Sequence, residues 1–255
     1  MGNNINDGYA DSNRFSDKAL LIYNDFLHSG KFLTHYKWLK NAAETYDIKL
    51  ELMGNSEFLC SYGTSFDKEL IETLGKYRFI LFWDKDIRLG KKFTNICKKI
   101  NIPIYNNIRA IADCDDKSAT YEKIGQWNDC HDTLEQIKMI PTIVAPMTYE
   151  NIGYTDMNFL DKVAEKFGFP LVIKECFGSF GMQVYMAHDM DELKKRVSDI
   201  GGKPMIFQKF IEKSSGFDVR LQVVGDEVVA AMYRYTDDGD FRANITHGGK
   251  MESYE

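Results

Sequence analysis

The sequence predicts a protein of two domains, one an α/β domain with an open parallel sheet and the other an α+β domain. The first observation is that short apolar strands alternate with helical stretches up to about residue 110. The second is that strands beyond residue 170 are joined by hairpin turns rather than by long crossovers. The third is the length of 255 residues, which suits two modest domains better than one small module.

The first domain is expected over residues 18–113, after a leader over residues 1–17 that is rich in Asn, Asp, Gly and Ser and predicted to be disordered. Its alternating strands and helices favour a parallel sheet with right-handed crossovers. The expected strands cover residues 19–23, 48–52, 78–83 and 103–105. The expected helices, which show apolar residues at spacings of three and four, cover residues 31–46, 68–74 and 91–100.

The second domain is expected over residues 114–255. Asp115 or Asp116 is a plausible N-cap for its first helix, which should run through Ile124 and break or kink over residues 125–130. Two prolines fix residues 140–146 as an extended connector. The expected helices beyond it cover residues 158–167, which should end at Gly168, and 190–198. The expected strands cover residues 171–174, 184–186, 205–211, 218–224 and 228–233.

A lysine ends the apolar strand over residues 171–174, and a segment with Gly178, Ser179 and Gly181 follows it. A buried ammonium without a counter-charge is costly, so Lys174 should either reach solvent or meet an anion. The glycines permit positive φ angles and a close approach of the backbone to phosphate oxygens. Together they indicate a nucleoside triphosphate site, although such a motif alone is more often an ordinary surface hairpin. Neither G-x-G-x-x-G nor G-x-x-x-x-G-K-[ST] occurs, which excludes the two commonest phosphate-binding fingerprints.

Composition and charge exclude several classes of function. The net charge of −6 gives no general basic field for nucleic acid or an anionic membrane. No apolar run approaches the roughly 20 residues of a membrane span, and the polar N-terminus lacks the apolar region of a signal peptide. The five cysteines are scattered and form no C-x-x-C pair, which favours reduced thiols. We therefore expect a cytoplasmic protein without nucleic-acid or membrane partners.

Further motifs follow in a fixed order from about residue 113 to Gly249. They are Asp116-Lys117, Gly168-x-Pro170-Leu-Val-Ile-Lys174, Gly178-Ser-x-Gly181, Gln208-x-Phe210-Ile211, Gly216-x-Asp218-Val-Arg220, and Asp240-Phe-Arg242-Ala-Asn244 through His247-Gly-Gly249. In this order they resemble the ATP-grasp superfamily and, within it, the RimK-like carboxylate–amine (alpha-L-glutamate) ligases. The resemblance implies an ATP-grasp fold that follows a Rossmann-like pre-ATP-grasp domain, and the first domain is similar only in its strand–helix pattern.

The resemblance also implies a set of nucleotide-binding residues. They are Lys117, Lys174, Gly178, Ser179, Gly181, Gln208, Lys209, Phe210, Ile211, Asp218 and Asn244. The two lysines suit phosphate oxygens, and the glycine segment would be a lid that closes over the triphosphate. The hinge after Gln208 would read adenine through its backbone N–H and C=O groups. Relatives commonly carry an acidic residue where Lys209 stands, and this departure affects a side-chain contact there but not the backbone one. Asp218 would meet a ribose hydroxyl or a cation, and Asn244 would lie at the nucleotide–metal site.

Two arginines are the candidate catalytic residues. Arg234 and Arg242 are expected to stabilise charge on a transferring phosphoryl group. The alternative for both is a surface ion pair with Asp237, Asp238 or Asp240.

The implied function is ATP-dependent ligation, in which a substrate carboxylate becomes an acyl phosphate and an amine then attacks it to form an amide. The implied substrates are an amino acid such as glutamate and a peptide or amine acceptor, and a homo-oligomer is left open. The first alternative is a catalytically impaired ATP-binding module that acts as a sensor or scaffold. A phosphotransferase that stops at a phosphorylated product is a weaker one. A purely structural two-domain protein explains neither the lysine pair nor the series from Asp218 to Asn244.

Magnesium is also implied, held in this family by an acidic residue in a later strand and by a Glu-x-Asn pair in the strand after it. No Glu-x-Asn occurs in the last hundred residues, so most metal ligands are expected beyond residue 255 and none is assigned within the chain. A triphosphate alone supplies only some of the oxygens that Mg²⁺ requires. We therefore expect a fragment of a longer enzyme, with a natural short form as the alternative, that binds ATP but turns it over poorly.

Overall fold

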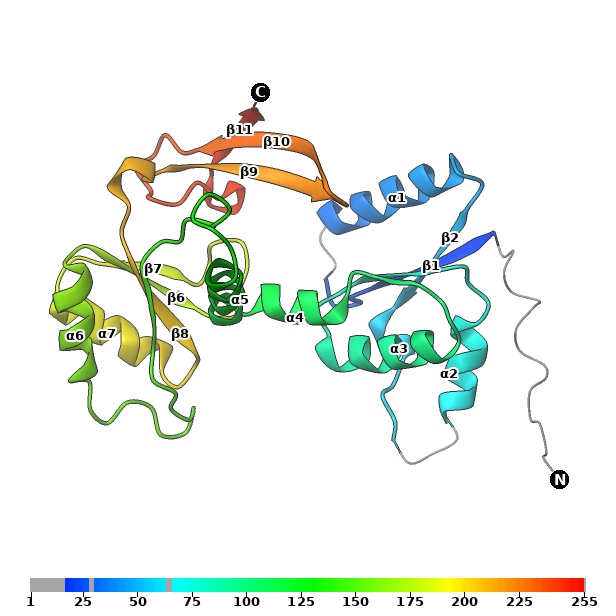
Figure 1. Cartoon of the computed structure of the whole chain (residues 1–255), viewed down its shortest axis with the longest axis horizontal. Helices are drawn as coiled ribbons and strands as arrows, with labels where there is room; N and C mark the ends of the chain where they lie inside the picture. The colour runs from blue at the N-terminus through cyan, green and yellow to red at the C-terminus, as the bar shows by residue number, and fades with distance from the viewer. Residues whose placement is uncertain (1–16, 28–29, 63–65, 255) are drawn as a thin grey trace. The chain divides into compact units, whose positions relative to one another are not determined.

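The computed structural model describes residues 17–27, 30–62 and 66–254, and these divide into two compact units at the step from Ala112 to Asp113 (Figure 1). The leader expected over residues 1–17 lies outside the described residues except for Asp17. Each unit has its own sheet and its own core.

The first unit contains a parallel sheet of four strands in the order β2-β1-β3-β4. Its strands are β1 (Lys18–Tyr23), β2 (Lys49–Gly54), β3 (Ile80–Trp83) and β4 (Ile104–Tyr105). Strand β1 pairs in parallel with β2 and β3, and β3 pairs in parallel with β4. The open parallel sheet predicted from the alternation of strands and helices is therefore confirmed.

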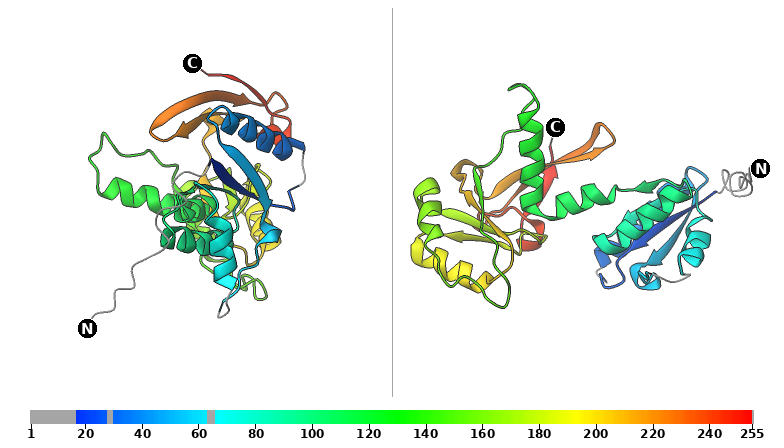
Figure 2. Two further views of the ribbon diagram at one scale, coloured as in Figure 1. Left: turned by 90° about the vertical axis from the view of Figure 1, so that its right-hand side faces the viewer. Right: turned by 60° about the horizontal axis from the view of Figure 1, so that its bottom comes forward.

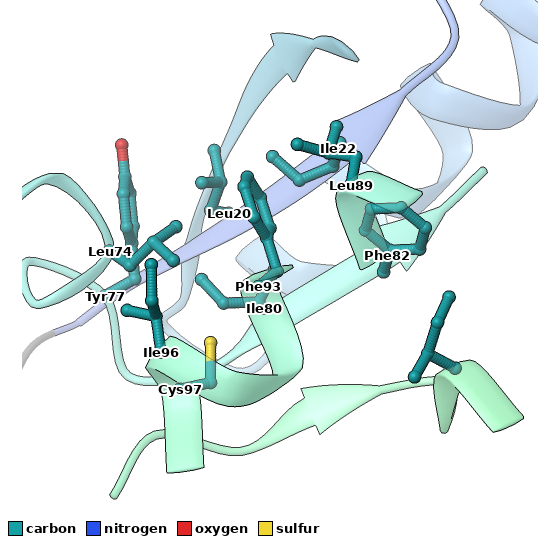
Figure 3. Close-up of a cluster of buried hydrophobic side chains, with 11 residues drawn as sticks. Leu20, Ile22, Leu74, Tyr77, Ile80, Phe82, Leu89, Phe93, Ile96 and Cys97 are labelled. Atoms are coloured by element: carbon teal, nitrogen blue, oxygen red, sulfur yellow. The ribbon is translucent and has the colours of Figure 1, made fainter. Parts of the chain in front are cut away.

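Helices cover both faces of this sheet. Successive side chains of a strand point to opposite faces, so the apolar residues of one strand pack against helices on both sides. Leu20 and Ile22 of β1 pack with α2 (Phe66–Leu74) and α3 (Ile87–Lys99), and Figure 3 shows Phe93 of α3 among them. Leu21 of β1 packs on the other face, against α1 (Gly30–Glu44). This two-sided burial explains the continuous apolar runs of the two central strands, β1 and β3.

The second unit has an antiparallel sheet in the order β5-β8-β6-β7. Its strands are β5 (Thr142–Val144), β6 (Leu171–Glu175), β7 (Val184–Ala187) and β8 (Met205–Lys209). One face packs on α6 (Phe159–Phe167) and α7 (Met190–Ile200), with Leu171, Ile173 and Phe207 fully buried there. The opposite face carries the alternate residues of the same strands, among them Lys174.

A second antiparallel sheet in the order β11-β10-β9 completes this unit (orange to red in Figure 2). Its strands are β9 (Phe217–Val224), β10 (Glu227–Tyr235) and β11 (Lys250–Ser253). Gly225, at φ 62°, makes the predicted hairpin turn between β9 and β10. Strand β11 was not expected, because the polar sequence around it lacks an alternating apolar pattern.

Several expected boundaries were wrong. Helix α5 (Lys117–Asp129) continues through Gly125, so the break predicted over residues 125–130 is absent. A glycine weakens a helix by about 1 kcal/mol relative to alanine but does not end it. Helix α4 (Ile108–Asp115) precedes α5 and was missed. The connector over residues 140–146 contains β5, and β8 ends at Lys209 rather than at residue 211.

Candidate nucleotide-binding site

Lys174 lies on the face of the first sheet that α6 and α7 do not cover. It is the fourth residue of β6 and stands opposite Val184 of β7 and Ile206 of β8. Its side chain is half-buried, and this burial, followed by the nearby ammonium of Lys117, lowers the pKa of Lys174 below its ordinary value. Within the described part of the chain its ammonium has neither a hydrogen bond nor an ion pair.

Lys117 is held beside the end of β6 because Asp116 caps α5. The Asp116 carboxylate accepts hydrogen bonds from the backbone N–H groups of Ser118 and Ala119, so the N-cap predicted at residue 115 or 116 is Asp116. The Lys117 backbone N–H donates to the carbonyl of Cys176 at 3.0 Å. The ammonium groups of Lys117 and Lys174, which come from distant parts of the sequence, are therefore both near the end of β6, where Lys117 lowers the pKa of Lys174.

The Lys117 ammonium also donates to the segment that follows β6. Its Nζ lies 3.0 Å from the carbonyl oxygen of Glu175 and 3.3 Å from those of Cys176 and Gly178. These three contacts fix the start of the loop over residues 176–183, which we call the glycine loop.

The glycine loop returns to the sheet through a hydrogen bond from the Glu175 N–H to the carbonyl of Gln183. Gly178 adopts φ 149°, and a Cβ atom there would lie 2.4 Å from Oε1 of Gln183. Only glycine therefore fits at this position. The side chains of Phe177 and Phe180 are about half exposed, so the loop presents apolar rings as well as backbone to solvent.

The residue before the predicted hinge is a glutamine whose side chain forms hydrogen bonds inside the protein. Gln208 is 2% exposed, and its Nε2 donates to the hydroxyl of Tyr121 at 2.6 Å and to Oγ1 of Thr142 at 2.8 Å. These contacts join β8 to α5 and β5. The side chain of the next residue, Lys209, is exposed, while its N–H donates to the carbonyl of Pro141.

Two hinge residues follow the end of β8. Ile211 precedes a short 3₁₀ helix, η2 (Glu212–Ser214). The ring of Phe210 meets that of Phe241 edge to face, with 6.4 Å between centroids. The hinge is thus in contact with the connection between β10 and β11.

Asp218 and Arg234 form a bidentate ion pair across β9 and β10, where they stand directly opposite each other. Arg234 Nε donates to Oδ1 at 2.6 Å and Nη2 donates to Oδ2 at 2.5 Å. Arg234 is only 9% exposed, whereas the Asp218 side chain is 42% exposed. The surface pairs with Asp237, Asp238 or Asp240 that were the alternative for Arg234 are therefore replaced by a pair with Asp218.

Arg242 links the β10–β11 connection to the glycine loop. Its Nη1 donates to the carbonyl of Gly181 at 3.2 Å, while Asp240 accepts from Nε at 3.0 Å and from Nη2 at 2.7 Å. The hydrogen bond with Asp240 raises the pKa of Arg242 above its ordinary value, so the guanidinium is permanently charged. The ion pair with Asp240 that was considered for this arginine is present.

Asn244 closes the same connection through its backbone. It precedes the 3₁₀ helix η3 (Ile245–His247), and its carbonyl accepts from the N–H of Gly249 at 3.2 Å. A Cβ atom at Gly249 would lie 2.6 Å from the carbonyl oxygen of Ala243. The glycine pair in the motif therefore permits a tight return into β11.

The structure thus brings Lys117, Lys174, the glycine loop and Arg242 together, and it places the Asp218–Arg234 pair on the second sheet. Sequence reasoning missed the role of Tyr121, whereas Asp240 had been named as a possible partner of Arg242. The spacing Asp240-x-Arg242 is a usable signal, because a carboxylate two residues away can reach the guanidinium. No sequence signal points to Tyr121, since its partner Gln208 is 87 residues away.

Comparison with known proteins assigns this unit to a family. Residues 129–255 match the model of the RimK-like ATP-grasp domain. The second half of the chain is a RimK-like ATP-grasp domain. The glycine loop, the hinge and the two arginines described above all lie within it.

Relatives and solved structures extend this assignment. The chain is 29% identical to the Mycoplasma pneumoniae protein "Uncharacterized protein MG012 homolog", over 92% of this chain and 76% of that protein. It is 37% identical to a probable alpha-L-glutamate ligase of an Enterobacter species, over 41% of this chain and 35% of that protein. The fold is similar to D-alanine–D-alanine ligase of Bacillus anthracis, with TM-score 0.58, 18% identity, and coverage of 93% and 72% of the two chains. The ATP-grasp fold expected from the sequence is confirmed.

No helix in the described ranges combines the length and the apolar character that a membrane span requires. Nor do these ranges contain a cluster of three or more His, Cys, Asp or Glu side chains that could hold a metal ion. Asp218 and Asp240 are each engaged by an arginine. The described residues thus do not form a Mg²⁺ site by themselves.

Proposed function

We propose that the chain binds ATP at the glycine loop and joins a carboxylate to an amine at the expense of ATP. The observation that carries this proposal is the meeting of Lys117 and Lys174 at the end of β6. Two ammonium groups repel each other in a partly buried place, and a bound polyanion removes that cost. A triphosphate has the charge and the length to contact both.

The proposed reaction has two steps. A carboxylate oxygen of the first substrate attacks the γ-phosphorus, the bond to the ADP oxygen breaks, and an acyl phosphate forms. The amine then attacks the acyl carbon, phosphate leaves, and the nitrogen loses a proton to give the amide. Catalysis of the first step requires positioning and charge neutralisation rather than covalent chemistry by the protein.

Arg242 and Lys174 are the proposed neutralising groups in that step. Arg242 is oriented by Asp240 and also contacts Gly181, so its guanidinium would follow the glycine loop when the loop closes over phosphate. Arg234 is oriented by Asp218 through Nε and one N–H of Nη2, and the two N–H groups of Nη1 are the donors that we assign to the nucleotide. The adenine would lie against the backbone of residues 209–211, and Asn244 would approach the phosphates.

Glutamate is the proposed carboxylate or amine substrate, on the basis of the alpha-L-glutamate ligase among the relatives. The other substrate is a peptide or a small amine. Mg²⁺ is proposed to arrive with the triphosphate. All five cysteines are free thiols, which supports a cytoplasmic location.

Calorimetry tests the nucleotide site. The intact chain, Lys174→Ala and the control Lys195→Ala, whose residue is exposed on α7, are titrated with ATP in excess Mg²⁺. We expect micromolar binding by the intact chain and the control, and none by Lys174→Ala. Equal binding by all three would place the nucleotide elsewhere.

A second assay tests the ligation itself. Phosphate release is measured with glutamate and a set of amines, and products are examined by mass spectrometry. An amide product supports the ligase, and a phosphorylated carboxylate alone indicates a phosphotransferase. ATP binding without phosphate release would favour the second candidate, an ATP-binding module, which the lack of a metal cluster among the described side chains also favours.

A further inference from the structure

Helix α5 contacts the first sheet of the second unit at two separate points. Its first residue, Lys117, donates through Nζ to the carbonyls of Glu175 and Cys176 at the end of β6. Tyr121 follows four residues later, and its hydroxyl accepts a hydrogen bond at 2.6 Å from Nε2 of Gln208 on β8. Residues four apart lie on the same side of an α-helix, so one face of α5 carries both contacts.

The two contacts serve different parts of the proposed nucleotide site. The end of β6 leads into the glycine loop, where Lys117 also donates to the carbonyl of Gly178. Gln208 is the residue immediately before the hinge over residues 209–211. Glu175 stands opposite Met205 in the pairing of β6 with β8, and Gln208 follows Met205 by about 10 Å along the strand. Helix α5 therefore bridges the loop proposed for phosphate and the hinge proposed for adenine.

The amide nitrogen of Gln208 uses both of its N–H groups inside the protein. The residue is 2% exposed, and Nε2 donates to Tyr121 and to Oγ1 of Thr142. Thr142 stands opposite Gln208 in the pairing of β5 with β8, so its contact acts within the sheet. The contact with Tyr121 instead joins the sheet to α5. A buried N–H group without an acceptor is costly, so this second contact holds β8 against the helix.

We propose that Tyr121 is a positioning residue, which sets the distance between the hinge and the glycine loop and so favours a ligand that carries a base as well as phosphates. This inference rests on the proposed nucleotide site. Tyr121 acts through Gln208 on the backbone N–H and C=O groups of residues 209–211, which would meet adenine. Hydrogen bonds weaken steeply when their angle is poor, so a small displacement of the hinge is enough to weaken the contact with the base.

The phosphate end of the site should not depend on Tyr121. Asp116 caps α5, and Lys117 makes its three carbonyl contacts without the tyrosine. Loss of the Tyr121 hydroxyl should therefore loosen the hinge and leave the glycine loop in place. A polyphosphate without a base should not sense the change.

Calorimetry with two ligands tests this difference. The intact chain and Tyr121→Phe are titrated with ATP and with inorganic triphosphate, both in excess Mg²⁺. We expect ATP to bind Tyr121→Phe about tenfold more weakly and triphosphate to change by less than about twofold, because the lost hydrogen bond affects the base end. The control Tyr149→Phe removes a hydroxyl from an exposed side chain and should bind both ligands as the intact chain does. Equal losses for both ligands, or no loss for ATP, would overturn the proposal.

A double variant separates positioning from stability. Tyr121→Phe leaves a buried N–H group of Gln208 without its acceptor and should therefore also lower the urea midpoint. Combining it with Gln208→Met replaces both partners by apolar groups of similar shape, which is often nearly neutral for stability. We expect the midpoint to recover while ATP binding stays about tenfold weaker, since α5 no longer holds the hinge. If ATP affinity recovers together with the midpoint, the role of Tyr121 is purely structural and the proposal is wrong.

Amide hydrogen exchange without nucleotide gives a readout that does not require ATP binding. In Tyr121→Phe, exchange over residues 209–211 should accelerate about tenfold, while exchange over residues 177–183 should match the intact chain. Unchanged exchange at the hinge would refute the positioning role even if ATP binds. An intact chain that binds neither ATP nor triphosphate would instead refute the proposed function, and faster exchange confined to the hinge would still support its positioning by Tyr121.

Discussion

The carboxylate of Asp218 holds the guanidinium of Arg234 through two hydrogen bonds, at 2.6 Å and 2.5 Å, across neighbouring strands. The pair is asymmetric, because Arg234 is buried while the Asp218 side chain is partly exposed. The arginine therefore depends on the aspartate for its counter-charge, and the aspartate can still meet solvent or a ligand. In the proposed function, Asp218 would therefore orient Arg234 and contact the nucleotide at the same time.

Replacing Asp218 should destabilise the fold as well as the site. Asp218→Asn leaves the guanidinium of Arg234 buried without a counter-charge, at a cost of about 1–3 kcal/mol in the free energy of unfolding. The matched control is Asp237→Asn, which removes the exposed ion pair with Lys250 and should leave the free energy of unfolding nearly unchanged. Urea unfolding of both variants measures the difference, and equal midpoints would show that the Arg234 pair is no stronger than a surface pair.

Replacing Lys174, unlike replacing Asp218, should stabilise the unliganded protein while weakening its binding of ATP. Lys174→Met keeps most of the side-chain volume and removes a desolvated charge, so the unliganded chain should unfold at a higher temperature. Affinity for ATP should fall roughly 10- to 100-fold, as expected for about 1.5–3 kcal/mol from a hydrogen bond to a charged group. Thermal unfolding with and without ATP tests both effects. A variant that loses stability without ATP would contradict the cost assigned to the charge.

Proton uptake on ATP binding should reveal the same lysine. Burial and Lys117 lower the pKa of Lys174 in the free protein, and phosphate oxygens would favour the charged form and raise it again. Binding should therefore take up protons at alkaline pH near the lowered pKa. Affinity should be fully present below that pKa and be lost as pH rises through the pKa of the bound state. Titrations in buffers with different ionisation enthalpies measure the uptake, which Lys174→Met should abolish. Uptake that persists in this variant would assign the proton to another group.

The sequence allowed the fold and the order of the motifs to be predicted because both are local. The strand before Lys174, the hairpin turn at Gly225 and the cap at Asp116 depend on neighbouring residues and were confirmed. The hydrogen bond of the Gln208 side chain could not be predicted, because its partner Tyr121 lies on a helix far away in sequence. Strand β11 was missed for a related reason, since a polar segment becomes a strand only when β10 offers its edge.

The ion-pair partners of Arg234 and Arg242 could also be predicted only where they are close in sequence. Sequence proximity suggested Asp237, Asp238 and Asp240 as the partners of both, and this is correct only for Arg242, which pairs with Asp240. Arg234 pairs instead with Asp218 because the register of β9 and β10 places them opposite each other. A register depends on the whole hairpin, so no spacing between the two residues could have indicated it.

The contact from Arg242 to Gly181 should control the order of the glycine loop. Arg242→Lys keeps the charge but loses the planar fork that satisfies Asp240 and the Gly181 carbonyl together. Hydrogen exchange over residues 177–183 should accelerate about tenfold, which corresponds to about 1.4 kcal/mol, close to the lower end of the range for a hydrogen bond to a charged group. The control Arg196→Lys changes an arginine whose ion pair with Asp199 is exposed, and it should leave exchange in the loop unchanged. If both variants exchange as the intact chain does, the loop is ordered by Lys117 and its three carbonyl contacts alone.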